Sequence, residues 1–235
     1  MNDANRPLTA LALNCSLKPS PESTSTQLLL DQVLAALAEH DVTGRQVRVV
    51  DLDIKPGVEA DMGGGDQWPA LRAEVRAADI LIIGTPIWVG HMSSVAQRVI
   101  ERLDAELSET DEEGRPALTG LVAAVAVVGN EDGAHKITGD LCQSLVDLGC
   151  TIPAQASTYW NGEAMHTVDY RDLDETPEEV AGATAALARN AAHLAQVLRV
   201  TPYPAPRGAT GGKGTAPATG ESLRGCSVHP QGLEP

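Results

Sequence analysis

The sequence contains no phenylalanine, and its 235 residues include only three tryptophans and three tyrosines. A hydrophobic core must therefore be built mainly from aliphatic side chains. Hydrophobic residues make up 43% of the chain, which is enough for one sizeable core. Because aromatic side chains are so scarce, any place where they gather is informative.

Positive charge is also scarce. The chain has 17 lysines and arginines against 32 aspartates and glutamates, a formal net charge of −15. Such a surface repels both the phosphates of nucleic acids and anionic lipids. We therefore expect neither nucleic acid nor a membrane as a partner.

Cysteine is rare, and the spacing of the cysteines matches no paired motif. No CxxC pair occurs, and no histidine stands at metal-ligand spacing from a cysteine, so the sequence predicts no metal site. The first residues lack a basic segment followed by an apolar one, and no apolar run reaches the length of a bilayer span. We expect a soluble cytoplasmic protein with reduced thiols.

Short apolar runs alternate with helical patterns over residues 8–199. The apolar runs predict five strands, at residues 8–14, 45–52, 79–86, 121–129 and 151–158. After each strand, apolar residues at helical spacing predict a helix. This alternation indicates an α/β fold with a parallel sheet covered by helices on both faces.

Local signals predict where several of these helices begin and end. Thr24 with Gln27, and Ser94 with Gln97, read as capping boxes, and Thr176 reads as the N-cap of the last helix. Gly149 suits the position after the fourth helix. From residue 200 to 235 the chain is rich in proline and glycine and poor in large apolar residues, which predicts a disordered tail after a domain formed by residues 1–199.

The loop after the first strand lacks glycine from Asn14 to Thr26. A dinucleotide-binding GxGxxG loop is therefore absent, although Asp51 stands where a ribose-binding acid would. The loop also lacks the GK[ST] of a P-loop, the carboxylates of a response regulator and the CxxxxxR of a low-molecular-weight phosphatase. Cys15 is therefore interpreted as a small buried residue.

The same loop is rich in hydroxyl groups. Hydroxyls and one ammonium group precede a predicted helix, whose free N–H groups and dipole attract anions. A single hydroxyl would suffice to cap the helix, so the surplus favours a bound phosphate monoester over a simple serine-rich turn. The side chains concerned are Ser16, Lys18, Ser20, Ser23, Thr24, Ser25 and Thr26.

Half of the aromatic residues follow other strand ends. Trp88 comes after the third strand, and Tyr159 and Trp160 come after the fifth. In a parallel α/β fold these loops meet at the carboxyl edge of the sheet, where ligands bind. A flat ring carrying a phosphate tether fits such a site, and flavin mononucleotide (FMN) is such a ligand. Trp160 could stack on the ring or belong to the core.

At this point a family resemblance is clear. The hydroxyl-rich loop, together with the segment TPIWVGHMSSVAQRVIER (residues 85–102), resembles the NAD(P)H-dependent FMN reductase-like family of the flavodoxin-like superfamily, over roughly residues 8–199. The resemblance implies a flavodoxin-like three-layer sandwich with strand order 2-1-3-4-5, with FMN as cofactor and NAD(P)H as co-substrate. It also favours a homodimer and a small-molecule electron acceptor.

The resemblance implies three groups of FMN-binding residues. The implied ligands are Ser16, Lys18, Ser23, Ser25 and Thr26 for the phosphate, Thr85, Pro86, Ile87, Trp88, Val89 and Gly90 for the ring edge, and Gly129, Asn130, Glu131 and Gly133 from the loop after the fourth strand. Hydride chemistry then belongs to the flavin, so no catalytic residue is named. His91 and His135 border the site and are interpreted as structural or solvated.

The expected function is the reduction of flavin, a quinone or another small acceptor. Two alternatives stay open at this stage. The acidic surface would suit a flavodoxin-like one-electron carrier that docks on a basic partner, although true flavodoxins carry glycine in this loop. The second alternative is a flavin-binding protein without turnover.

Overall fold

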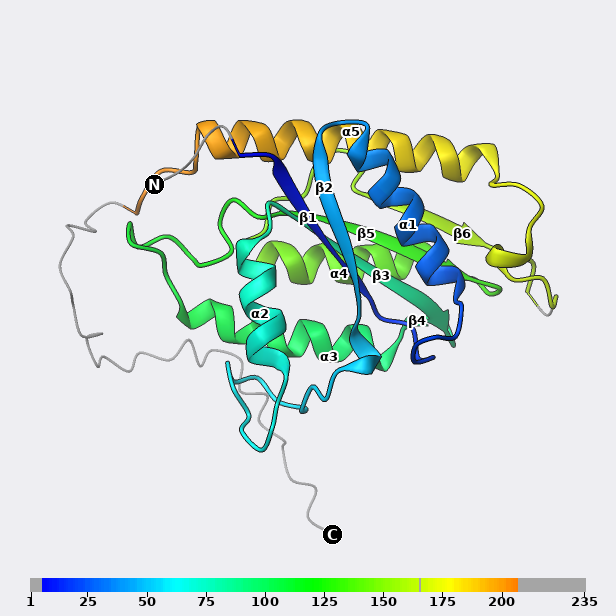
Figure 1. Ribbon diagram of the computed structural model, residues 1–235, viewed down its shortest axis with the longest axis horizontal. Coiled ribbons are helices and arrows are strands. Elements are labelled where there is room, and N and C mark those ends of the chain that lie inside the picture. The colour runs from blue at the N-terminus through cyan, green and yellow to red at the C-terminus, as the bar shows by residue number, and fades with distance from the viewer. Residues whose placement is uncertain (1–5, 165, 207–235) are drawn as a thin grey trace, which may run out of the picture.

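The computed structural model describes residues 6–164 and 166–206 (Figure 1). Its strands are β1 (Leu8–Asn14), β2 (Val42–Arg48), β3 (Ile80–Trp88), β4 (His91–Met92), β5 (Val122–Gly129) and β6 (Ser157–Asn161). Its α-helices are α1 (Ser25–Ala38), α2 (Trp68–Ala77), α3 (Ser94–Leu103), α4 (Ala134–Asp147) and α5 (Glu178–Val200). Three 3₁₀ helices add η1 (Val49–Asp51), η2 (Asp104–Ser108) and η3 (Tyr170–Asp172).

The five long strands form one parallel sheet in the order β2-β1-β3-β5-β6. Counted along the chain without the short β4, this is the predicted order 2-1-3-4-5, so the flavodoxin-like sandwich is confirmed. The two-residue β4 turns back on the end of β3, pairing Met92 with Ile87 and His91 with Trp88. This hairpin lengthens β3 two residues beyond the predicted end.

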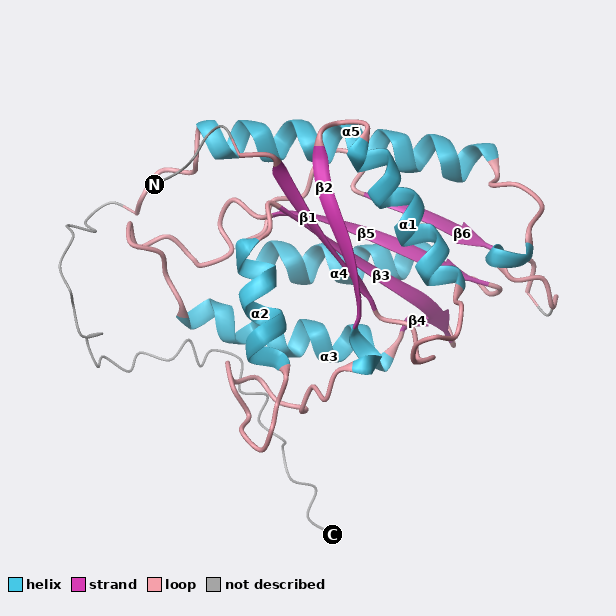
Figure 2. Cartoon of the chain, viewed as in Figure 1, coloured by secondary structure: helices cyan, strands magenta, loops and turns pink. Residues whose placement is uncertain are grey.

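Helices cover both faces of the sheet (Figure 2). One core lies between the sheet and α1 with α5, and the other lies between the sheet and α2, α3 and α4. Strands β1, β3 and β5 are buried almost throughout, as their unbroken apolar sequences predict. Within the described residues no helix combines the length and apolarity needed to cross a membrane.

The fifth predicted strand is misplaced. The sequence favours residues 151–158, but Thr151 makes only an isolated bridge to Val122, and the strand proper is Ser157–Asn161. Pro153 lacks an N–H for the ladder, and Gln155 has a φ of +56°, which turns the chain away from β5. Regular pairing resumes only after that turn.

The second strand is also shifted. It runs over Val42–Arg48 rather than residues 45–52, because the chain turns at once into η1, where the N–H of Leu52 bonds the carbonyl of Val49. The sequence of Gly44 and its polar neighbours does not predict a strand. Their pairing with β1 nevertheless makes them one.

Two predicted N-caps are wrong and one is confirmed. Thr24 caps α1 as predicted, accepting the N–H of Gln27 at 3.1 Å. Helix α3 is capped by Ser93 rather than Ser94, because the Ser93 hydroxyl accepts the N–H of Ala96. Thr176 instead accepts a hydrogen bond from Gln32 of α1, and Pro177 stands at the start of α5.

The last described residues continue past the predicted domain boundary. Helix α5 ends at Val200, and Thr201–Pro206 follow as an exposed segment. Within it, the Tyr203 carbonyl accepts a hydrogen bond from Arg115. Most of the predicted tail, residues 207–235, lies outside the described residues, so its disorder stays a prediction.

Candidate functional site

A cavity of about 580 Å³ opens at the carboxyl edge of the sheet, where β1, β3 and β5 end. It is the place that the α/β architecture predicts for a ligand. The loops after these strands and the connection between β6 and α5 supply its walls. The lining residues are Ser16, Leu17, Lys18, Thr24, Ser25, Thr26, Pro86, Ile87, Trp88, Val128, Gly129, Asn130, Glu131, Ala164, Asp169 and Arg171.

One end of the cavity is built to receive an anion. Thr24 begins α1, so the N–H groups of Ser25 and Thr26 lie in its first turn, where no intrahelical carbonyl is available to them. Ser16 stands beside them, 3% exposed, and its hydroxyl has no hydrogen-bond partner among the described residues. A buried unpaired hydroxyl is costly unless a ligand or water satisfies it.

Two residues outside the loop hold it in shape. Arg48, at the end of β2, donates from Nη1 to the carbonyls of Lys18, Pro19 and Glu22. Asp51 accepts the Ser20 N–H at 2.8 Å and the Ser20 hydroxyl at 2.6 Å. The Ser20 hydroxyl bond, more than any other contact, lowers the pKa of Asp51. Asp51 thus anchors the loop and is not among the residues that line the cavity.

The opposite wall is apolar. Ile87 is buried, Pro86 is partly buried, and the Trp88 side chain is 50% exposed at the rim. Gly129 packs closely against them, since a Cβ at this position would lie 2.8 Å from the Cβ of Ile87. The cavity therefore combines an anion-binding end with a wall suited to a flat ring.

A hairpin turn borders this wall. Val89 and Gly90 join β3 to β4, and their N–H groups donate to the two carboxylate oxygens of Glu131 at 2.9 and 3.2 Å. Gly133 approaches so closely that a Cβ there would lie 2.9 Å from the Gly90 Cα. The turn and the β5–α4 loop are thus locked together by Glu131 and by two glycines.

Two charged residues of the β6–α5 connection, which no sequence pattern predicted, also line the cavity. Arg171 donates from Nη1 to the carbonyl and hydroxyl of Ser23, and its backbone N–H reaches the Ser25 hydroxyl at 3.4 Å. Asp169 accepts the side-chain N–H of Asn130 at 2.9 Å. No local pattern marks either residue, because a connection of irregular structure brings them to the cavity.

Ten of the fifteen predicted ligand residues line the cavity. These are Ser16, Lys18, Ser25, Thr26, Pro86, Ile87, Trp88, Gly129, Asn130 and Glu131. The other five are not among the lining residues: Thr85 is buried and accepts the Ser93 N–H, Ser23 bonds Arg171, and Val89, Gly90 and Gly133 form the locked turn that borders the cavity. The structure thus indicates supporting positions for these five.

The remaining predicted neighbours of the site point elsewhere. Trp160 packs in the core, with its ring centroid 5.5 Å from that of Tyr170, which decides between the two alternatives for this residue. Tyr159 shares a hydrogen bond with His135, and His91 accepts one from Lys136 at 3.2 Å. Burial raises the pKa of the Cys15 thiol, in agreement with an inert buried residue.

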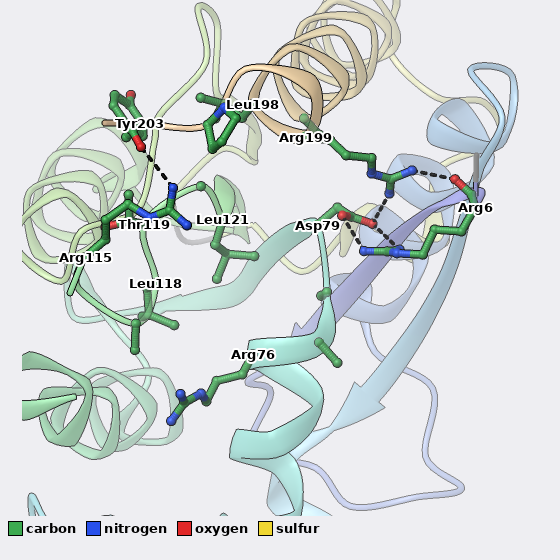
Figure 3. A pocket seen from close by; sticks show the side chains of 16 residues that line it. Arg6, Arg76, Asp79, Arg115, Leu118, Thr119, Leu121, Leu198, Arg199 and Tyr203 are labelled. Atoms are coloured by element: carbon green, nitrogen blue, oxygen red, sulfur yellow. Dashed lines mark hydrogen bonds and ion pairs between the residues drawn. The ribbon is translucent and has the colours of Figure 1, made fainter. Parts of the chain in front are cut away.

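A second cavity, of about 320 Å³, lies at the opposite, amino edge of the sheet (Figure 3). Its arginines are already engaged: Arg6 and Arg199 both hold Asp79, and Arg115 donates to the Tyr203 carbonyl and pairs with Asp111. The C-terminal ends of α2 and α5 also point here, and their dipoles disfavour an anion. This cluster ties the two ends of the domain together.

Comparison with known proteins agrees with the carboxyl-edge site. The family model described as NADPH-dependent FMN reductase matches residues 8–163, which is more than half of the chain. The chain belongs to this family. The family's description pairs FMN with NADPH, which confirms the predicted cofactors.

One curated protein and one solved structure each align with most of this family member. The 8-demethyl-8-aminoriboflavin-5′-phosphate synthase of Streptomyces davaonensis is 32% identical over 206 residues, covering 83% of this chain and 80% of that protein. The crystal structure of RosB, with the bound intermediate 8-demethyl-8-formylriboflavin-5′-phosphate, has a TM-score of 0.76 at 32% identity and covers 83% of this chain and 82% of that one.

Another relative is much longer than the present chain. The protein described as divalent metal cation transporter MntH of Mycobacterium bovis is 38% identical over 222 residues, which is 92% of this chain. The match covers 32% of that protein, so this chain spans about a third of the relative's length.

The cavity fits the cofactor that the family implies. An FMN phosphate needs donors at one end and an apolar surface for its ring at the other. The unpaired Ser16 hydroxyl beside the first turn of α1 meets the first need, and Pro86 and Trp88 meet the second. Among the described residues no group of three or more histidine, cysteine, aspartate or glutamate side chains could hold a metal ion.

Proposed function

We propose that this chain binds FMN in the carboxyl-edge cavity and uses NAD(P)H to reduce a small acceptor such as a free flavin or a quinone. One observation carries the proposal. The buried hydroxyl of Ser16 has no partner among the described residues, and it faces a cavity whose far wall is the Pro86–Trp88 segment. A ligand with a phosphate at one end and a flat ring at the other satisfies both features.

The residues of the chain have distinct tasks in this proposal. Ser16, Ser25 and Thr26 would hold the phosphate, with the Lys18 ammonium adding positive charge. Pro86 and Trp88 would shape the ring pocket and exclude water from one side. Bound FMN would supply the hydride chemistry itself, so the protein binds and orients while leaving access for the nicotinamide.

The acceptor would reach the flavin at the exposed rim of the cavity. Leu17, Trp88 and Val89 are exposed apolar side chains there. They support a small apolar acceptor, and they also support the homodimer expected from the family resemblance, since a second copy would cover part of this rim. Sedimentation of the FMN-loaded protein checks the dimer directly.

Anaerobic mixing tests the redox function. The FMN-loaded protein is mixed with NADH or NADPH, and the flavin absorbance is followed in a stopped-flow instrument. We expect bleaching within seconds with at least one nucleotide, followed by rapid return of colour when a quinone is added. Bleaching over hours, together with fast reduction by a one-electron donor, would instead identify a carrier.

The similarity to the Streptomyces davaonensis synthase supports a second candidate, because the match covers about four fifths of both chains. In that case the flavin phosphate would be a substrate, and its ring substituents would change. Recovering the flavin after turnover and measuring its mass distinguishes the two functions. An unchanged mass supports the reductase, and a changed mass supports the flavin-modifying enzyme.

A further inference from the structure

We propose that Arg171 is the residue that makes the cavity selective for phosphorylated flavins over riboflavin. This inference rests on the proposed function, in which the cavity holds FMN. Arg171 lies in η3, beyond residues 8–163, so it stands outside the segment that the family model matches. The phosphate-binding part of the cavity would therefore be completed by a residue of the β6–α5 connection.

Arg171 is fastened directly to the hydroxyl-rich loop. Its guanidinium donates from Nη1 to the Ser23 carbonyl and, at 3.2 Å, to the Ser23 hydroxyl. Its backbone N–H reaches the Ser25 hydroxyl at 3.4 Å. The side chain therefore sits at the anion-binding end of the cavity, beside the first turn of α1, and not at the end formed by Trp88.

A buried neighbour holds Arg171 in this place. Tyr170 is 2% exposed, and its hydroxyl donates to the side-chain oxygen of Gln32 in α1 at 2.6 Å. The Tyr170 ring also packs on Trp160. Arg171 is thus pre-positioned by the core, which spares the entropy of ordering a long side chain when a ligand binds.

Donors remain on the guanidinium for a ligand. The Arg171 side chain is 31% exposed, and its Nη2 and Nε lie 3.5 Å from Asp169 and 3.7 Å from Asp172, which are ion-pair distances rather than hydrogen bonds. Planar guanidinium groups bind phosphate oxygens through two parallel N–H groups. Phosphate oxygens would thus compete with Asp169 and Asp172 for Nη2 and Nε, neither of which donates a hydrogen bond within the described part of the chain.

The cavity lining supplies two cationic side chains that a phosphate could contact. Lys18 and Arg171 are the two cations among the lining residues. The two lining carboxylates are held by uncharged donors, Glu131 by the N–H groups of the 89–90 turn and Asp169 by the Asn130 amide, and Asp169 also forms an ion pair with Arg171 at 3.5 Å. Two cations match the two negative charges of a phosphate monoester above its second pKa of about 6.

The variant Arg171→Gln tests this selectivity. The affinities of wild type and variant for FMN and for riboflavin are measured by fluorescence titration, with exposed Arg189 of α5 changed to glutamine as a control of equal charge. We expect Arg171→Gln to weaken FMN binding by about ten-fold or more, and to change riboflavin binding by less than about two-fold. The control should change neither.

A pH profile adds a readout that a merely structural role would not move. Between pH 5 and 7.5 the FMN phosphate gains its second charge, so wild-type affinity for FMN should rise and that of Arg171→Gln should rise much less. Riboflavin affinity should stay flat in both. Arg171→Lys keeps the charge and the aliphatic stem, and should recover part of the FMN affinity and of its rise with pH.

Several outcomes overturn the assignment. Equal losses for FMN and riboflavin would make Arg171 a structural residue, and unchanged FMN binding would remove it from the site. If Arg171→Gln does not fold, Arg171→Lys and the wild-type pH profile test the proposal instead. A flat wild-type profile then contradicts it. Absence of FMN binding by the wild type would instead reject the proposed function itself.

Discussion

The carboxylate of Glu131 accepts a hydrogen bond from the backbone N–H of Val89 at 2.9 Å, joining the β5–α4 loop to the β3–β4 hairpin. Val89 has a φ of +53°, which is strained for a β-branched residue, and its side chain is 84% exposed. Packing therefore does not explain the turn. The charge-assisted bonds that Val89 and Gly90 donate to Glu131 hold the turn, and with it the neighbouring Trp88.

Removal of Glu131 should loosen this turn. We expect Glu131→Ala to weaken FMN binding by about ten-fold and to speed hydrogen exchange at residues 89 and 90. Adding Val89→Gly should restore part of the affinity, because glycine adopts this φ without strain. Asp147→Ala, at the far end of α4, serves as the control. A double variant no better than the single one would contradict the strain argument.

Trp88 should matter for the ligand and not for the fold. It is half-exposed, so Trp88→Ala should change the free energy of unfolding by less than about 0.5 kcal/mol while weakening FMN binding by about ten-fold. Urea unfolding and flavin titration measure the two effects. Trp88→Phe should retain most of the affinity. A large loss of stability with unchanged affinity would remove Trp88 from the ring pocket.

Asp66 should determine part of the acid stability. Burial raises its pKa, but hydrogen bonds from the Met62 N–H, the Arg102 guanidinium and two further N–H groups outweigh this and lower it to about 2. A carboxylate whose pKa is lower in the folded than in the unfolded chain stabilises the fold at pH values above the unfolded pKa of 3.8. That stabilisation is lost as the pH falls toward about 2.

The variant Asp66→Asn tests this. It leaves Arg102 as a buried unpaired charge, so we expect a loss of about 3 kcal/mol in the free energy of unfolding at neutral pH. The difference from wild type should shrink as the pH falls below 3.8. Asp53→Asn breaks the exposed pair with Lys55 and should cost less than about 0.5 kcal/mol. A difference that is constant with pH would contradict the pKa assignment.

Truncated chains should distinguish the contribution of residues 201–206 to stability from that of the predicted tail. Residues 207–235 contain few large apolar side chains, so ending the chain after Pro206 should leave the melting temperature and FMN affinity unchanged. Ending it after Val200 also removes Tyr203, whose carbonyl and hydroxyl accept from Arg115 and Thr151, and should lower the melting temperature by a few degrees. Equal melting temperatures of the two truncated chains would contradict a role for Tyr203.

Sequence alone determined what depends on neighbouring residues and on repeated pattern. The alternation of apolar runs with helical spacing is sufficient to predict a parallel α/β sheet. The Thr24 cap is also local, because it joins residues only three positions apart. The positions of the ligand loops follow from the rule that parallel strands end at one edge. Within these loops the family resemblance implied fifteen ligand residues, and ten of them line the cavity, from Ser16 to Glu131.

Only the tertiary structure decided the contacts between distant segments. Arg171 reaches Ser23 across 148 positions of sequence, and Glu131 reaches Val89 across 42, so no local pattern signals either pair. The same holds for Thr176, whose hydroxyl bonds Gln32 of α1 and does not cap α5. The partner of such a side chain comes from a distant segment, so it is known only once the elements have packed.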